Sequence, residues 1–189
     1  MAESALFPDE ALIAVQLLDG TAVNVTTDID NFEEGGFERE TEFRPFFHGA
    51  KVTIKKQQSE GELTLNAKVT RATWDEMLWG NTGSDFTSGG VQSAYRITFL
   101  VTKDPAALLT TALATDAVAP GYDTYRKIYA NCFLTGFNPK LEAEGMLEGE
   151  AVFMVAPKDE SSDPNVRIQI GSSGYAAVGD YTTAQKWTA

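Results

Sequence analysis

The feature that most constrains the fold is a ten-residue segment, Gly61 to Thr70, in which apolar and polar side chains alternate. The apolar positions are Leu63, Leu65, Ala67 and Val69, and the polar positions are Glu62, Thr64, Asn66, Lys68 and Thr70. A two-residue period is that of a β-strand with one face on a core and the other in water. The sequence therefore predicts a sheet with one buried face.

Extended segments of this kind recur along the chain, separated by turn residues and by two short helical patterns. The further strands are expected at residues 13–17, 23–25, 37–44, 51–55, 95–102, 125–137, 145–156 and 166–170. Residues 31–36, with two acids and paired glycines, are expected to form a loop. The fold class predicted is mainly β, an antiparallel β-sandwich or barrel with one or two short flanking α-helices and extended loops or arms.

The two helices are predicted from their start signals. Thr73 and Glu76 have the spacing of a capping box, and Gly80 is the expected stop. Asp104 followed by Pro105 predicts the start of a second helix, with the aspartate as its N-cap. Trp74 and Trp79 on the first helix are expected to anchor it in the core.

The chain divides by composition into a β domain at residues 1–170 and a C-terminal arm at residues 171–189, which is small and polar with three aromatics. The net charge is −12. Residues 1–50 carry 11 acids and 2 bases, a net of −9. This balance argues against ordinary nucleic-acid binding, which needs clustered basic residues. It suits a surface past which DNA moves without adhering, and it suits simple solubility equally well.

Few residues of the chain carry catalytic chemistry. There is one histidine, His48, and one cysteine, Cys132, which is expected to be a small buried hydrophobe. No glycine-rich phosphate loop is present, and residues 159–163 lack the register of an EF-hand loop. No apolar run is long enough to span a bilayer, so no membrane insertion is expected. We therefore predict no enzyme activity, no catalytic or metal site and no cofactor.

Two parts of the chain resemble a known family. The stretch from Gly61 to Gly80, a strand that runs straight into a capped helix, resembles the central segment of the major tail tube proteins of long-tailed, siphovirus-type bacteriophages. Residues 127–139 and 145–157 are similar to the closing strand pair of those proteins. The resemblance implies hexameric rings that stack into a hollow tube, the virion tail, through which DNA is delivered.

The resemblance also implies partners and a location. The partners would be other copies of the chain, the tape measure and terminator proteins of the tail, and genomic DNA in transit without specific binding. Assembly would take place in the cytoplasm of the host bacterium. The C-terminal arm would carry three aromatic assembly anchors: Tyr175, Tyr181 and Trp187.

An acidic hairpin is the candidate for the channel wall. Residues 37–44 and 51–58 are expected to pair, with Glu42 opposite Lys51 and Glu38 opposite Lys55. This hairpin and its neighbours supply the candidate lumen-facing acids, Asp28, Asp30, Glu33, Glu34, Glu38, Glu40 and Glu42. A solvated outer face is the alternative for the same residues.

Three other functions remain open from the sequence. One is a head–tail completion or capsid-decorating protein, which would form a trimer or a single ring. Another is a carbohydrate-binding β-sandwich module, for which exposed tryptophans would be needed. The third is an enzyme such as a glycosidase, which would need two acids across a cleft.

Overall fold

A computed structural model describes residues 10–38, 41–45, 51–55, 59–69, 73–80, 92–108, 112–141, 145, 147–159 and 163–187. For residues 41–45 and 51–55 it describes the backbone alone. Ten strands, one α-helix and one 3₁₀ helix lie in these ranges. In chain order they are β1 (Ala11–Leu17), β2 (Ala22–Asn24), η2 (Thr26–Asp28), β3 (Ile29–Gly36), β4 (Thr41–Pro45), β5 (Lys51–Lys55), β6 (Gly61–Lys68), α1 (Thr73–Trp79), β7 (Tyr95–Thr102), β8 (Thr124–Leu141), β9 (Leu147–Val155) and β10 (Val166–Gly171).

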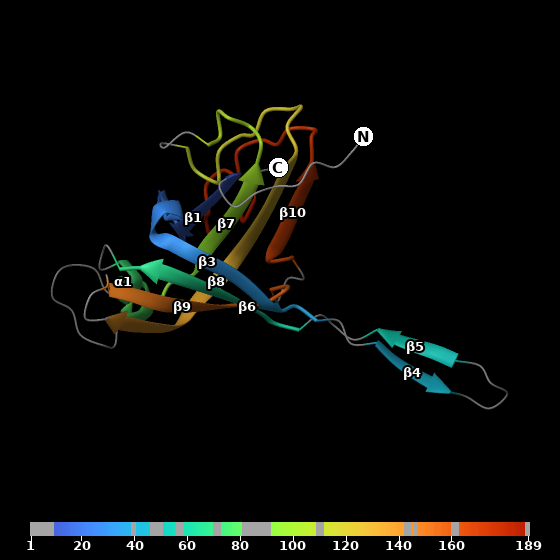
Figure 1. Cartoon of the computed structure of the whole chain (residues 1–189). Helices are drawn as coiled ribbons and strands as arrows, with labels where there is room; N and C mark the ends of the chain where they lie inside the picture. Colours follow the sequence, from blue (N-terminus) through green and yellow to red (C-terminus); the bar gives the residue numbers. More distant parts are fainter. Residues whose placement is uncertain are drawn as a thin grey trace.

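Eight of the strands form one antiparallel sheet, in the order β2-β1-β7-β8-β9-β6-β3, with β10 also paired to β8. The long strand β8 divides this sheet into two layers. Its first half pairs with β7 and β10, and its second half pairs with β9. Layer A is therefore β2, β1, β7, the first half of β8 and β10. Layer B is the second half of β8 with β9, β6 and β3, and its strands cross those of layer A (Figure 1).

The change of direction in β8 has local causes. Asn131 has a positive φ of 53°, and the pairing of β8 with β9 shifts register between Leu134 and Gly136. Asparagine adopts this left-handed conformation more readily than most residues, and bulges let one strand pass from one layer to another. The main core lies between the layers. It is formed by Ile13, Val15, Leu63, Leu65, Ile97, Tyr129, Leu134, Phe137, Phe153 and their neighbours.

The strand predictions hold in most places. In β6 the side chains of Leu63, Leu65 and Ala67 are at most 2% exposed, whereas Glu62 is exposed. Strands β1 and β2 form the expected first hairpin, and α1 ends at Gly80, whose N–H donates to Glu76 O at 2.9 Å. The antiparallel, mainly β fold class is confirmed.

Two element predictions are wrong. Residues 31–36 lie in strand β3, at an edge of the sheet. Most of its side chains are polar and face water, so the strand lacks the alternation of apolar and polar residues that would have predicted it. Residues 105–108 form turns, not a helix. Asp104 does accept a hydrogen bond from the Ala106 N–H at 2.9 Å, as an N-cap would. Its second oxygen accepts from the Ala119 N–H at 3.0 Å, which ties the turn to a later loop.

The acidic hairpin is present, and it continues the hairpin made by β3 and β6. The Phe37 N–H donates to Glu60 O at 3.2 Å and the Ser59 N–H donates to Glu38 O at 3.0 Å. Strands β4 and β5 pair beyond this point, so the whole hairpin projects from the body of the protein (Figure 1).

The predicted register of that hairpin is wrong. Lys55 lies opposite Thr41, and Lys51 lies opposite Pro45, not opposite Glu42. The prediction treated Pro45 as the start of the turn, but it is the last paired residue of β4. Proline lacks an N–H and is tolerated on such edge strands. Glu42 consequently pairs with Ile54.

The C-terminal segment packs on its own domain. Residues 172–187 lie on the face of layer A opposite the main core, where Val178 and Tyr181 are 2% and 1% exposed. The Val178 N–H donates to Thr115 O and the Asp19 N–H donates to Tyr181 O, both at 2.8 Å. The segment that the sequence suggested as an arm thus covers one side of the sheet.

Candidate assembly surfaces

The outward face of layer B is acidic. The strand registers place its side chains in four cross-strand rows. The acids on this face are Asp30, Glu33, Glu62, Glu148 and Glu150, all exposed, and the bases are Lys68 and Lys140. Five acids against two bases give a net charge of −3. The main core lies behind this face, so layer B is a wall with one dry and one charged side.

One ion pair on this face joins Lys68 to Asp30. Lys68 Nζ lies 2.8 Å from Asp30 Oδ1, with the two side chains 35% and 51% exposed. The hydrogen bond and the charge of Asp30 raise the pKa of Lys68, so the amine stays protonated. An exposed pair of this kind contributes little to stability, because water screens both charges. A pocket of about 380 Å³ at this end of the face is lined by Asp30, Asn66, Ala67, Asn138, Pro139, Lys140, Glu148, Gly149 and Glu150.

The structure separates the seven candidate lumen acids. Asp30 and Glu33 lie on the outward face of layer B. Asp28 is only 7% exposed and lies in η2. Glu34 points to the other side of β3, where it forms an ion pair with Lys127, which reaches over from β8.

Two of the remaining three candidates, Glu38 and Glu42, lie on the projecting hairpin. Glu38 is exposed at its base. Glu42 is in β4, where only the backbone is described, and Glu40 lies outside the described residues. Sequence reasoning missed Glu62, Glu148 and Glu150 as members of the acidic face. Glu62 could have been found from the alternation in residues 61–70, since it was already assigned to the wet side of that strand.

Among the described residues, layer B has two open strand edges. One is the outer edge of β3, the last strand of layer B. The other is the edge of β8 beyond Cys132, where the pairing with β7 ends and only the Gln92 side chain donates, to Leu134 O. These are the two opposite sides of layer B. An open edge offers unpaired N–H and C=O groups to another chain.

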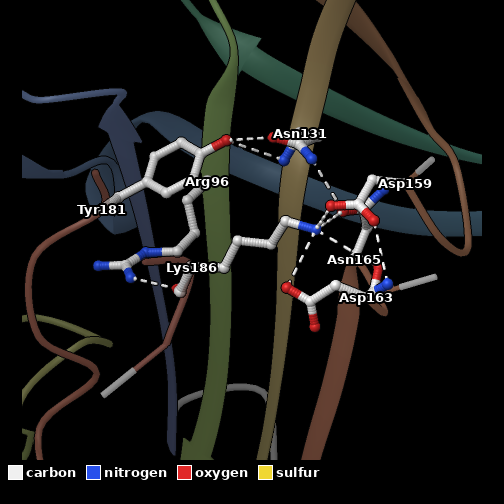
Figure 2. Close-up of polar contacts among 7 residues, drawn as sticks. All are labelled: Arg96, Asn131, Asp159, Asp163, Asn165, Tyr181 and Lys186. Carbon is white, nitrogen blue, oxygen red and sulfur yellow. Dashed lines mark hydrogen bonds and ion pairs between the residues drawn. The ribbon is translucent and has the colours of Figure 1, made fainter. Parts of the chain in front are cut away.

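A polar network fastens the C-terminal segment to the sheet (Figure 2). The Tyr181 hydroxyl donates to Asn131 Oδ1 at 2.7 Å and accepts from the Asn131 N–H at 3.0 Å. Asn131 Nδ2 donates to Asn165 Oδ1 at 2.9 Å. Lys186 Nζ donates to the same Asn165 oxygen at 2.8 Å and to Asp159 Oδ2 at 2.6 Å. Asp163 Oδ2 lies 3.5 Å from Lys186 Nζ.

Two buried arginines lie beneath the same segment. Arg96 is 1% exposed and donates to the backbone oxygens of Gly179 and Lys186 and to Gln16 Oε1. Its guanidinium carbon lies 5.4 Å from the centre of the Tyr181 ring. Burial lowers the pKa of Arg96 to about 10, yet the group stays charged at neutral pH.

Arg126 repeats the arrangement one strand further on. It is 0% exposed and donates to Gln169 Oε1 at 2.5 Å and to the backbone oxygens of Asp116 and Ala176, both at 2.6 Å. Its guanidinium carbon lies 5.9 Å from the centre of the Tyr175 ring. All the acceptors of the two arginines are uncharged oxygens. The C-terminal segment supplies two of the acceptors of Arg96, the backbone oxygens of Gly179 and Lys186, and one acceptor of Arg126, the backbone oxygen of Ala176. The segment therefore supplies the solvation that two buried cations need.

The three candidate anchors have different settings. Tyr181 is buried, whereas Tyr175 and Trp187 are half-buried. The rings of Tyr181 and Tyr175 both lie beside buried arginines of the same chain. Trp74 is buried at 3% as expected and stacks on Phe137, with ring centres 6.2 Å apart. Trp79 is 41% exposed, so the expectation that both tryptophans anchor the core is wrong for this one.

The groups of ordinary catalytic chemistry are not assembled in the described part of the chain. Cys132 is fully buried, and desolvation raises the pKa of its thiol. Within the described ranges no three histidine, cysteine or acidic side chains are placed to hold a metal ion. None of the helices described there is long and apolar enough to cross a membrane. His48 lies outside the described residues.

Comparison with solved structures places this architecture among components of contractile injection systems. A chain from the PVC sheath/tube terminator in the extended state matches with a TM-score of 0.55 and 15% identity, over 89% of this chain and 99% of that one. A chain from the PVC sheath–tube complex matches with a TM-score of 0.53 and 16% identity, over 90% and 95% of the two chains.

A chain from the tube-terminating cap of the anti-feeding prophage has a TM-score of 0.52 and 16% identity, again over 90% and 95%. No protein-family profile and no curated protein sequence matches the chain. The protein has a tail-tube-like fold. The matches come from contractile systems, so the narrower likeness to siphovirus-type tail tubes is not specifically supported.

Proposed function

We propose that the protein is a structural subunit that assembles into rings, and that the rings stack into a tail tube. The observation that carries the proposal is layer B, a four-stranded wall with a buried face, an acidic face and an open edge on each side. In a ring, the β3 edge of one copy pairs with the free part of the β8 edge of the next. Such pairing removes both edges and closes a barrel.

The size of this barrel can be worked out from the strands. Six copies of four strands give about 24 strands, and a spacing of about 4.8 Å gives a backbone diameter of about 37 Å before tilt. The acidic face then lines the channel. Like charges keep a polyanion such as DNA from adhering, and the effect weakens when salt screens it. The projecting hairpin reaches the neighbouring ring.

Negative-stain microscopy and sedimentation of the purified protein test the proposal. We expect rings or tubes of uniform diameter at high micromolar concentration. A strictly monomeric species over a range of concentration and salt would overturn it. A single ring that never stacks would support the second candidate, a tube-terminating ring, which the likeness to the terminator and cap structures favours.

A shortened hairpin separates ring closure from stacking. Glu38 and Ser59 are paired, so residues 39–58 can be replaced by Asn-Gly, a favoured two-residue hairpin turn. This variant should keep its melting temperature and form single rings, but no tubes. The matched control keeps the hairpin length and replaces only residues 46–50 by glycine and serine. Tubes from the shortened variant would exclude the hairpin as the stacking element.

A further inference from the structure

The strand directions of layer B determine how two copies of it can join. Neighbouring strands of the layer are antiparallel, in the order β8, β9, β6 and β3. Because there are four strands, β3 runs opposite to β8, and the β3 edge of one copy meets the β8 edge of the next copy in antiparallel orientation. In the ring of the proposed function, on which this inference rests, the strand directions therefore alternate without a break.

The side chains on the acidic face limit the registers in which these two edges can pair. On that face, the β3 edge presents Glu33, and the regular part of β8 that follows its register shift presents Gly136, Asn138 and Lys140. A slip by one residue would turn every side chain to the other face, so only registers that differ by two residues keep the acidic face continuous. Within this part of β8, Glu33 can therefore lie opposite Gly136, Asn138 or Lys140 of the next copy.

We propose that Glu33 pairs with Lys140 of the next copy in the ring. Within one copy, Lys140, Glu148 and Lys68 lie opposite one another across β8, β9 and β6. The neighbouring Glu33 extends this row, so that acid and base alternate along four strands. Opposite charges on facing strand residues attract each other. In the other two registers, Glu33 faces the uncharged Asn138 or Gly136.

The same register covers an apolar side chain that is open in the single copy. Leu141 is 72% exposed and lies at the end of β8, on the core side of layer B. When Glu33 lies opposite Lys140, the adjacent residue Phe32 lies opposite Leu141. Phe32 also faces the core side, where it stacks on Phe99 with ring centres 4.9 Å apart, and it is half-buried. Facing residues have Cβ atoms about 4.5–5.5 Å apart, so the leucine gains an apolar neighbour.

The shift between rows also gives the tilt of the strands in the closed barrel. Within one copy, Glu33 lies in the same row as Thr64, Val152 and Gly136. Pairing Glu33 with Lys140 of the next copy moves this row by about four residues per copy, or about 24 residues for six copies and about 24 strands. With a rise of about 3.3 Å per residue and about 4.8 Å between strands, the strands tilt by about 35°. Closed barrels typically have tilts of about 35–45°, whereas a shift of two residues would give about 19° and no shift would give no tilt.

Disulfide trapping in assembled rings measures this register. The variant Glu33→Cys/Lys140→Cys is oxidised and run on a non-reducing gel; the native Cys132 is fully buried and can stay. Within one copy the two positions are three strand steps apart, about 14 Å, so the disulfide can form only between copies. The control variants are Glu33→Cys/Asn138→Cys and Glu33→Cys/Gly136→Cys, in which the second position lies at least about 6.6 Å further along β8. We expect a ladder of linked species for the first variant and about tenfold less linkage for the controls.

Sedimentation of the same samples separates the register from the ring itself. Rings in which Glu33→Cys/Lys140→Cys does not link, or in which a control variant links equally well, would overturn the register and leave the proposed ring in place. A native sequence that stays monomeric would overturn both.

Charge reversal tests the pairing without new cysteines. Glu33→Lys or Lys140→Glu alone brings like charges together at every contact of the ring, so each variant should need about tenfold more protein to assemble. An equal mixture of the two variants restores opposite charges in a ring of alternating copies, and it should assemble at the native concentration. The control mixture is Lys140→Glu with Glu62→Lys, which changes the same face on a strand away from the edge and should not restore assembly. If the first mixture assembles no better than its components, or the control mixture assembles equally well, the pairing of Glu33 with Lys140 is wrong.

Discussion

Removing one hydroxyl from the C-terminal network should destabilise the whole domain. In Tyr181→Phe the ring stays beside Arg96, but the Asn131 N–H and Oδ1 lose their partner at 3.0 and 2.7 Å. Tyr181 is 1% exposed, so water cannot easily replace the hydroxyl. A buried polar group left unsatisfied costs about 1–3 kcal/mol. We expect a loss of about 1–3 kcal/mol, or roughly 2–10 °C in melting temperature for a domain of this size.

The assay is urea unfolding followed by circular dichroism, with Tyr122→Phe as the matched control. Tyr122 is 38% exposed, and its hydroxyl removal should change stability by less than about 0.5 kcal/mol. Lys186→Met tests the other end of the network. Because Asn131 and Asn165 connect Tyr181 to Lys186, the two substitutions should be non-additive by about 0.5 kcal/mol or more. Equal stability of Tyr181→Phe and Tyr122→Phe would refute the reasoning.

Three further predictions concern the segment, the buried titratable groups and the acidic face. Deleting residues 172–189 should lower the melting temperature strongly, because Arg96 and Arg126 lose backbone acceptors. An unchanged melting curve would instead support the independent C-terminal arm that the sequence predicts. Burial raises the pKa of the Cys132 thiol and of the Tyr129 hydroxyl above their values in the unfolded chain. As the pH rises, these groups therefore lose their protons in the unfolded state before they do so in the folded state. Stability should thus be constant near neutral pH and fall above about pH 9, as urea unfolding between pH 7 and 11 would show. Tyr129→Phe should weaken this fall, and a flat profile in the native sequence would contradict the assignment. Replacing three outward acids by glutamine should change the free energy of unfolding by less than about 0.5 kcal/mol and make tubes retain DNA at low salt. The three acids to replace are Glu62, Glu148 and Glu150. If tubes of this variant release DNA as native tubes do, the acidic face lies outside the channel.

Local patterns in the sequence determined the elements that pack on one side only. The alternation of residues 61–70 follows from a strand with a dry and a wet face, and its apolar side is buried as expected. The helix at Thr73–Trp79 and the turn between β1 and β2 also follow from local signals, since caps and tight turns depend on a few neighbouring residues. Residues 31–36 could not be predicted as a strand in this way, because an edge strand exposed to water does not need alternating apolar and polar side chains.

Only the tertiary structure decided which surfaces are free. Acids from β3, β6 and β9 meet on one face because layer B pairs strands that are far apart in sequence, as where Gly61 of β6 lies opposite Val155 of β9. The sequence around the aromatic residues of the C-terminal segment does not indicate that the segment covers Arg96 and Arg126. The hydrogen-bond acceptors of these buried arginines lie far away in the sequence, so only the folded structure shows them. The register of the projecting hairpin likewise depends on where the turn begins, and a proline fits both the turn and an edge strand. Burial and long-range pairing are properties of the whole chain, so residue patterns alone could not assign them.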